Sequence, residues 1–175
     1  MQFNGIQKTG ILLLCVALPF IPSAVAAEGP TLDGSTATTV VKPVGIEKYR
    51  GATELSDNDL KDLLSEVGFK GQALRIAWAV AKKESNGRPK AHNGDLSTGD
   101  NSYGIFQINM LGSLGKDRRE KFELKNDLEL FDPVKNAQIA YHMTNGGSNW
   151  SSWKINPGKD NGSRYEEFFE KFPKI

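Results

Sequence analysis

Two short segments contain residue types that can transfer a proton and bind a polar ligand. Glu84 and Ser85 stand where a helical pattern ends, and residues 102–109 downstream combine a glycine with amide side chains. A carboxyl group on the apolar side of a helix keeps its proton more readily, because burial disfavours its charged form. Such a proton donor can act as a general acid, and amide groups can bind a sugar beside it. The two segments therefore indicate glycosidic bond cleavage.

Helical spacing places Glu84 on the apolar side of its helix. It follows Ala77 by seven residues and Ala81 by three, in the same stripe, whereas Lys82 and Lys83 point away from that stripe. A glutamate after two lysines is ordinarily a solvated charge. Its assignment as an acid therefore depends on the neighbouring segments.

Residues 102–109 supply the candidate sugar contacts. Gln107 and Asn109 alternate onto one face of a strand and offer amide donors and acceptors, although outward polar residues of a half-exposed strand would show the same pattern. Gly104 admits a close approach by a sugar or by backbone. Tyr103 can stack on a sugar or pack in the core, and Ser85 is expected to orient the carboxyl at the helix end.

The elements that must position these residues are mainly helical. A capping pattern at Ser56 and Asp59 predicts a first helix that ends at Gly68, and residues 73–84 form the second helix. Turn residues over 93–101 predict a small hairpin lobe whose far strand covers 103–109. Two further helices are expected, a core helix that begins at Asp132-Pro133 and closes near Gly146, and a final amphipathic helix marked by Tyr165, Phe168, Phe169 and Phe172. The predicted fold class is mainly α (α+β), a helical bundle around the helix of Glu84 with a small β-hairpin lobe.

Residues 1–26 show the pattern of a signal peptide. Lys8 precedes an apolar run over 11–18, and Ala24-Val25-Ala26 provides small residues for cleavage. The run is short and is interrupted by Pro19 and Pro22, so no stable membrane span is expected after cleavage. The sequence thus predicts export to the periplasm or the extracellular space.

The remainder divides into a linker and one domain. Residues 27–50, with glycine, proline and a threonine-rich stretch, predict a flexible linker, and a short edge strand over 38–41 is the alternative. Residues 51–175 form the single domain. The only cysteine, Cys15, lies in the predicted signal peptide, so the exported domain is held by its core alone.

Charge and composition exclude several classes of partner. The chain has 22 Lys and Arg and 21 Asp and Glu; without Lys8 the exported part has 21 of each, which gives no electrostatic basis for binding nucleic acid. With two histidines, His92 and His142, and no exported cysteine, we expect no metal site and no cofactor. A calcium module built on Asp95, Ser97 and Asp100 lacks the terminal glutamate of an EF-hand.

The segment that contains Glu84 resembles a known family. Residues 81–109 are similar to the active-site stretch of the soluble lytic transglycosylase (SLT) domain of the lysozyme-like superfamily, and the resemblance extends over about residues 71–153, including a following helix at 132–141. It implies that Glu84 is the catalytic acid, that Ser85 is its neighbour in the cleft, and that Gln107 lines the substrate groove. The residues that carry it are Glu84-Ser85, Pro89, Ala91, Asn93, Tyr103-Gly104-Ile105-Phe106-Gln107-Ile108-Asn109, Asp132-Pro133, Asn136-Ala137 and Ala140-Tyr141.

One departure bears on the reaction. Animal-type lysozymes, which the segment also resembles, have an aspartate directly before the Tyr-Gly pair, and here that position is Ser102. A second carboxylate must lie within about 5 to 9.5 Å of the first. Asp95 and Asp100 are the acids of the turn-rich lobe, and both are better explained as turn residues. The resemblance therefore implies a single-acid mechanism that yields 1,6-anhydromuramic ends on peptidoglycan glycan strands.

A second departure leaves the partner of Glu84 open. The family's Tyr-Asn-Ala-Gly-like motif after the last helix is absent, and Trp150-Ser151-Ser152-Trp153 stands in this region. Tyr141 or Tyr103 could supply the missing hydroxyl, and the tryptophans could close the core or line the cleft. The alternatives to a transglycosylase are a hydrolytic lysozyme with Asp95 or Asp100 as base, and an inactive wall-binding protein on the same fold. By analogy, components of a virion or a secretion system would be its partners.

Overall fold

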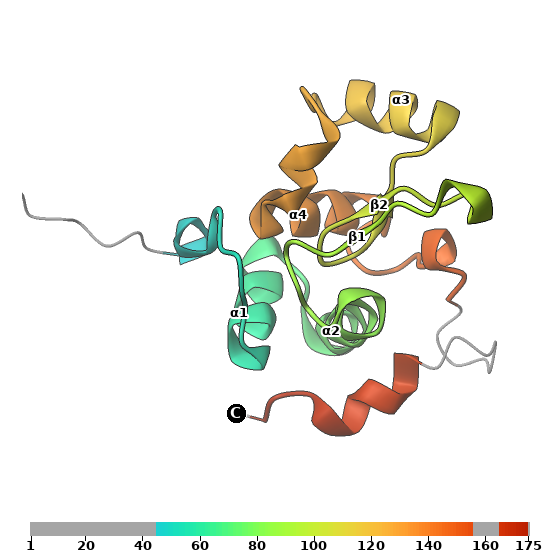
Figure 1. Ribbon diagram of the computed structural model, residues 1–175. Coiled ribbons are helices and arrows are strands. Elements are labelled where there is room, and N and C mark those ends of the chain that lie inside the picture. Colours follow the sequence, from blue (N-terminus) through green and yellow to red (C-terminus); the bar gives the residue numbers. More distant parts are fainter. Residues whose placement is uncertain (1–44, 156–164, 175) are drawn as a thin grey trace, which may run out of the picture. The chain divides into compact units, whose positions relative to one another are not determined.

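The computed structural model describes residues 45–155 and 165–174. The predicted signal peptide, residues 27–44 of the predicted linker and the alternative edge strand lie outside the described residues. The elements in chain order are η1 (Gly45–Tyr49), α1 (Asp57–Val67), α2 (Gly71–Ser85), β1 (His92–Asn93), η2 (Leu96–Thr98), β2 (Ser102–Tyr103), β3 (Ile108–Asn109), α3 (Gly112–Lys121), η3 (Asp127–Phe131), α4 (Pro133–Met143), η4 (Ser151–Trp153) and η5 (Tyr165–Lys171), where η marks a 3₁₀ helix (Figure 1).

The described residues form a mainly helical domain with a small sheet, as the sequence predicts. Within this part, α-helices and 3₁₀ helices surround α2, and the three strands pair antiparallel in the order β1-β2-β3. In Figure 1, α2 lies between the strands above it and η5, in red, below it. No helix of the described part is long and apolar enough to cross a membrane.

Helix α1 begins and ends as its sequence predicts. The Ser56 side chain accepts a hydrogen bond from the Asp59 amide at 3.1 Å, and the Asp59 carboxylate accepts one from the Ser56 amide at 3.2 Å. A cap of this kind contributes about 1 kcal/mol. The helix ends at Gly68, whose φ of 126° a residue with a Cβ rarely adopts, and it buries Leu60, Leu63 and Leu64.

Helix α2 is the central element of the domain. Residues 76–81 are all buried, which shows that neighbours cover the middle of this helix on every side. The Trp78 indole donates to the Asp57 carbonyl oxygen at 3.1 Å and joins α2 to the start of α1. The helix ends at Asn86, which is left-handed with φ 57°, and Arg88 donates to the Ser85 carbonyl oxygen at 2.9 Å. Glu84 thus lies in the last turn of a fixed helix.

The predicted linker boundary at residue 50 is wrong for the last residues of that segment. Residues 45–49 form η1, and Tyr49 is buried in the core with a relative exposure of 4%. Arg50 pairs with Glu47 at 2.7 Å and with Asp132 at 3.2 Å. Burial of the Tyr49 ring gives this stretch a fixed position that its Gly- and Pro-containing sequence does not indicate.

The predicted single strand over 103–109 is also wrong, because a tight turn divides it. Strand β2 ends at Tyr103, and β3 begins at Ile108. Between them, Gly104 and Gln107 have positive φ values of 74° and 47°. The Gln107 backbone amide donates to the Gly104 carbonyl oxygen at 3.1 Å and closes the turn. The Asn136 side chain of α4 accepts from the Phe106 amide at 3.0 Å and donates to the Tyr103 carbonyl oxygen at 2.9 Å. A contact from outside the strand therefore holds this turn.

The elements after β3 agree with the sequence prediction at α4 and differ from it at the last helix and at α3. Asp132 caps α4 by accepting from the Val134 amide at 2.9 Å, as predicted. The predicted last helix is the 3₁₀ helix η5, whose aromatic side chains pack against the core. Phe172, directly after η5, makes a T-shaped contact with Trp78 of α2, with ring centroids 5.6 Å apart. The sequence did not predict α3, because an apolar stripe is absent from it: Gly115 is its one buried residue.

Candidate active site

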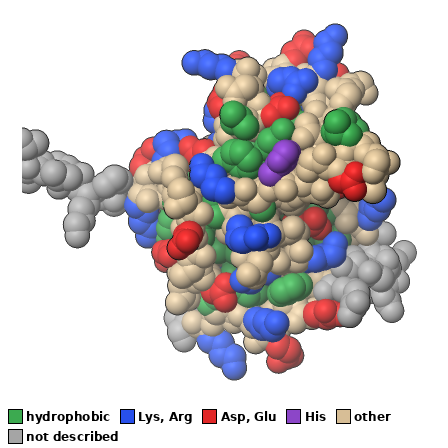
Figure 2. All heavy atoms as spheres, in the orientation of Figure 1, with side chains coloured by type: hydrophobic (Ala, Val, Ile, Leu, Met, Phe, Trp, Pro, Cys, Tyr) green, Lys and Arg blue, Asp and Glu red, His purple; other side chains and the backbone are tan. Residues whose placement is uncertain are grey.

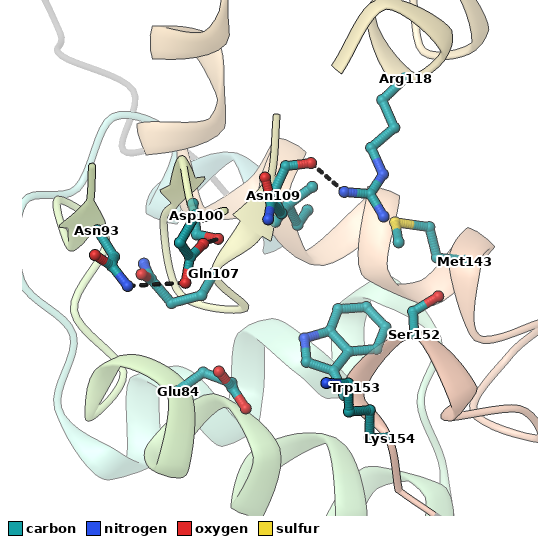
Figure 3. Close-up of a pocket in the computed structure, with 12 residues that line it drawn as sticks. Glu84, Asn93, Asp100, Gln107, Asn109, Arg118, Met143, Ser152, Trp153 and Lys154 are labelled. Carbon is teal, nitrogen blue, oxygen red and sulfur yellow. Dashed lines mark hydrogen bonds between the residues drawn. The ribbon is translucent and has the colours of Figure 1, made fainter. Parts of the chain in front are cut away.

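A polar pocket of about 390 Å³ opens beside the C-terminal end of α2. Figure 3 shows its side chains, with Glu84, Asn93, Asp100 and Gln107 toward one end and Arg118, Met143, Ser152 and Trp153 toward the other. The described part of the chain has no group of three or more His, Cys, Asp or Glu side chains that could hold a metal ion. The pocket is lined by Glu84, Asn93, Asp100, Ser102, Gln107, Ile108, Asn109, Arg118, Met143, Ser152, Trp153 and Lys154.

The register of the sheet creates one wall of this pocket. Asn93 pairs with Ser102 across β1 and β2, and Ser102 pairs with Asn109 across β2 and β3. Paired residues of neighbouring strands project to the same face of a sheet. A row of two amides and a hydroxyl therefore borders the pocket, a surface suited to sugar hydroxyl and acetamido groups.

Glu84 is the acid that α2 contributes to the pocket. Its side chain is 22% exposed and lies 3.0 Å from the Lys83 ammonium. A partly exposed pair of this kind is worth at most about 1 kcal/mol. Neither Tyr103 nor Tyr141 hydrogen-bonds to Glu84, so among the described residues Lys83 is the group that holds the carboxylate. This pairing leaves the carboxylate free to turn into the pocket at little cost.

Asp100 is the second carboxylate of the pocket. Its two oxygens accept hydrogen bonds from the Asn93 amide at 2.8 Å and from the Ser102 hydroxyl. Asp95, in contrast, is an exposed turn residue, which caps η2 by accepting from the Ser97 amide at 3.1 Å. Hydrogen bonds from the Ser97 hydroxyl and amide hold the pKa of Asp95 below its ordinary value. Of the two acids that the sequence offered, Asp100 faces the site.

Gln107 and Asn109 both line the pocket, and their amide groups are partly engaged within the protein. The Gln107 nitrogen donates to the carbonyl oxygens of Ala91 at 3.1 Å and Gly104 at 2.9 Å. The Asn109 nitrogen donates to the Gly99 carbonyl oxygen at 3.0 Å, and its oxygen accepts from the Leu111 amide at 2.9 Å. Within the described residues, the Gln107 side-chain oxygen accepts no hydrogen bond. The Gln107 oxygen can therefore accept a hydrogen bond from a ligand.

The two tryptophans divide the roles that the sequence left open. Trp150 is buried at 1% exposure, and its indole donates to the Gly147 carbonyl oxygen at 2.9 Å. Trp153 lines the pocket, and its indole donates to the Phe106 carbonyl oxygen at 2.8 Å. Their ring centroids lie 5.7 Å apart. Trp150 thus closes the core and supports Trp153 from behind.

Four residues predicted to contact substrate are absent from the pocket lining. The Ser85 hydroxyl donates to the Ile105 carbonyl oxygen at 2.8 Å and is buried. Tyr103 projects to the other face of the sheet, because side chains alternate along β2, and stacks on His92 at 4.4 Å. Tyr141 packs at 5.0 Å on Phe69, which precedes α2 at the end opposite Glu84. None of these three side chains lines the pocket.

Gly104 is the fourth of these residues, and its role is packing. A Cβ at this position would lie 2.3 Å from the Asn136 side chain and 2.3 Å from the Leu130 carbonyl oxygen. The glycine is required because α4 approaches the turn closely, so it does not provide space for a sugar. It allows Asn136 to reach the backbone of the turn.

The sequence did not identify several residues of the pocket. Arg118 comes from α3, whose pattern is weak, and Met143 comes from the end of α4. Asn136 does not line the pocket but supports the turn beside it. Its place on the buried side of a helix indicates such a role, since a buried asparagine inside a helix is unfavourable unless its side chain hydrogen-bonds elsewhere. Trp153 is one of the two tryptophans for which the sequence leaves a place in the cleft open. The lining residues for which the sequence predicted no substrate contact are Asn93, Ile108, Ser152 and Lys154.

Comparison with known proteins gives the family of the chain. A family model described as a lysozyme-like domain matches residues 61–155, which include α2, the sheet, α4 and Trp153. The milk isozyme of lysozyme C from Canis lupus familiaris is 32% identical over 101 residues, which cover 53% of this chain and 78% of that protein. No solved structure matches the chain. Because the family model covers more than half of the sequence, the chain belongs to the lysozyme-like family that includes the SLT domains.

Proposed function

We propose that this protein cleaves the β-1,4 bond between N-acetylmuramic acid and N-acetylglucosamine in peptidoglycan, with Glu84 as the acid. The observation that carries the proposal is the position of Glu84, in the last turn of α2 and beside a pocket wall of two amides and a hydroxyl. A general acid must reach the bridging oxygen while neighbouring groups orient the sugar. The pocket offers both functions within one site.

The first candidate reaction is that of a lytic transglycosylase. Glu84 donates a proton to the bridging oxygen as the bond from C1 to that oxygen breaks, and the substrate's acetamido group stabilises the positive C1. Glu84, now a carboxylate, takes the proton of the C6 hydroxyl as O6 bonds to C1. The product is a 1,6-anhydromuramic end, and no water is consumed. Support comes from Ser102 at the position of the lysozyme aspartate.

Hydrolysis is the second candidate, and Asp100 is the observation that favours it. Asp100 lines the same pocket as Glu84 and is bonded to the Ser102 hydroxyl. A second carboxylate at a glycosidic site can act as a base toward water or stabilise the positive C1. The transglycosylase reaction is placed first because both Asp100 oxygens already accept hydrogen bonds from Asn93 and Ser102.

Mass spectrometry of digested peptidoglycan separates the two reactions. Purified sacculi are incubated with the full chain, and the released muropeptides are measured before any chemical reduction. We expect anhydromuramic ends. Reducing muramic ends, heavier by one water, would replace the first candidate by the second.

The assignment of the acid is tested by Glu84→Gln, which keeps the shape of the side chain and removes its proton transfer. We expect the rate of sacculus digestion to fall by about 10²- to 10⁴-fold, the range for loss of a general acid. Glu120→Gln, on the exposed surface of α3 and outside the pocket lining, is the matched control and should digest at the wild-type rate. Equal digestion by wild type and Glu84→Gln would remove Glu84 as the acid, and no digestion by either protein would leave the wall-binding alternative.

Access to peptidoglycan requires export, for which residues 1–26 are the proposed signal peptide. The proposed location is the periplasm or the cell exterior. A virion or a secretion machine would suit a small enzyme that opens the wall locally, an extension that rests on analogy.

A further inference from the structure

Arg118 is a pocket residue that the proposed reaction does not use. Its guanidinium donates to the Asn109 carbonyl oxygen, and this is the one hydrogen bond it makes within the described residues. A guanidinium has five N–H donors in a planar fork. Most of its donors are therefore available to a ligand in the pocket.

Arg118 has no carboxylate partner among the described residues, in contrast to the next residue along α3. Arg119 pairs with Asp127 at 2.6 Å, outside the pocket. Arg118 is partly buried, and its burial lowers its pKa below the ordinary value. A partly desolvated cation without a counter-ion favours the binding of an anion at that place.

Figure 3 places Arg118 toward the end of the pocket away from Glu84 and Asn93, beside Met143 and above Trp153 and Ser152. A ligand that runs along the pocket can therefore contact Glu84 and Arg118 at the same time. Glycan strands of N-acetylglucosamine alone are neutral, whereas the muramic sugar has a lactyl arm that ends in a carboxylate or in a peptide with carboxylates.

We propose that Arg118 binds a carboxylate on the lactyl arm of a muramic sugar and thereby selects peptidoglycan strands over neutral N-acetylglucosamine polymers. This inference rests on the proposed function and specifies its substrate class. A planar fork matches a carboxylate in a bidentate way, which an ammonium group cannot do. The carboxylate is either the free lactyl group of peptide-free strands or a carboxylate of the stem peptide.

The test measures binding in the Glu84→Gln background, in which the ligand is not consumed. Isothermal titration gives Kd for three tetrasaccharides: alternating N-acetylglucosamine and muramic acid with free lactyl groups, the same sugar with stem peptides, and chitotetraose. We expect at least one muramic ligand to bind about tenfold more tightly than chitotetraose. Adding Arg118→Gln should remove that difference, and Arg118→Lys should keep part of it.

Arg119→Gln is the matched control, because it removes the same charge from the same helix outside the pocket, and it should preserve the difference. If Arg118→Gln weakens the binding of the peptide-free ligand alone, the lactyl carboxylate is the group that Arg118 binds. If it weakens the binding of the peptide-bearing ligand alone, that group is a carboxylate of the stem peptide. Three outcomes would overturn the inference. Arg118→Gln could weaken the binding of chitotetraose as much as that of the muramic ligands, it could leave the preference for muramic ligands unchanged, or the Glu84→Gln parent could bind none of the sugars. Arg118-dependent binding by a wild-type chain that releases no product from sacculi would instead contradict the proposed function.

Discussion

At the scale of single residues, the second carboxylate of the site stands at Asp100 and not at Ser102, and this position determines how the site is interpreted. The strand position at which animal-type lysozymes have an aspartate is a serine here, and that serine donates a hydrogen bond to an aspartate two residues earlier. The pocket therefore contains a second carboxylate although the expected position lacks one. Its chemical contribution distinguishes the two candidate reactions.

Asp100→Asn tests this contribution with little change in shape. If Glu84 acts alone, we expect sacculus digestion to stay within about tenfold of wild type and to yield anhydromuramic ends, because loss of a true acid or base costs about 10² or more. Initial rates and product masses are measured together. Asp95→Asn, which alters the exposed acid of the same lobe, is the control. A loss as large as that of Glu84→Gln would make Asp100 a catalytic residue.

At the scale of elements, two buried polar side chains fix the turn of residues 104–107 between α2 and α4. Ser85 donates to Ile105 from the end of α2, and Asn136 bonds to the turn and to the Leu130 carbonyl oxygen, at 2.9 Å, from α4. Because Ser85 is next to Glu84, the first bond sets the distance between the acid and Gln107. The helices thus position both sides of the pocket.

Asn136→Ala should destabilise the domain more than an ordinary surface change. It leaves a buried amide and two carbonyl groups without their partner, and each such group costs about 1 to 3 kcal/mol. We expect the free energy of unfolding in urea to fall by at least about 2 kcal/mol. Asn58→Ala, on the exposed side of α1, should change it by less than about 0.5 kcal/mol. Similar midpoints for both variants would contradict the role of Asn136.

The sequence predicted the elements whose signals are local. Helices α1 and α4 carry their caps within a few residues, and the stripe of α2 led to Glu84. The turn at Gly104 depends on Asn136, 32 residues away in the chain, and the face of Tyr103 depends on strand register. Arg118 stands on a helix that has little apolar pattern of its own. Features determined by distant residues were thus the ones that the sequence alone did not reveal.

At the scale of the molecule, the family match ends at residue 155, yet η5 belongs to the same core. Arg75 of α2 donates to the Phe169 carbonyl oxygen at 3.3 Å, Lys61 of α1 donates to the Pro173 carbonyl oxygen at 3.0 Å, and Tyr165 is 1% exposed. On the face in Figure 2, acidic and basic side chains are interspersed. The helix that holds Glu84 is therefore covered partly by residues outside the family match.

Tyr165 links η5 to the stability of the whole domain at alkaline pH. Burial, together with a hydrogen bond to Glu166, raises the pKa of Tyr165 from 10.0 to about 12. Its stabilising effect is complete below pH 10 and is lost as pH rises through 12, because the unfolded chain releases this proton first. Between pH 8 and 11.5, the melting temperature of wild type should fall more steeply than that of Tyr165→Phe. Parallel curves would contradict this assignment.

The bond between Phe106 and Asn136 has a consequence for motion in the site. Short turns commonly exchange their amide hydrogens with water through small local openings. The Phe106 amide is fully buried, and its acceptor belongs to α4, so the turn opens when α4 separates from it. That separation would also displace Gln107, which lines the pocket. The lifetime of the intact site is therefore tied to the lifetime of the folded core.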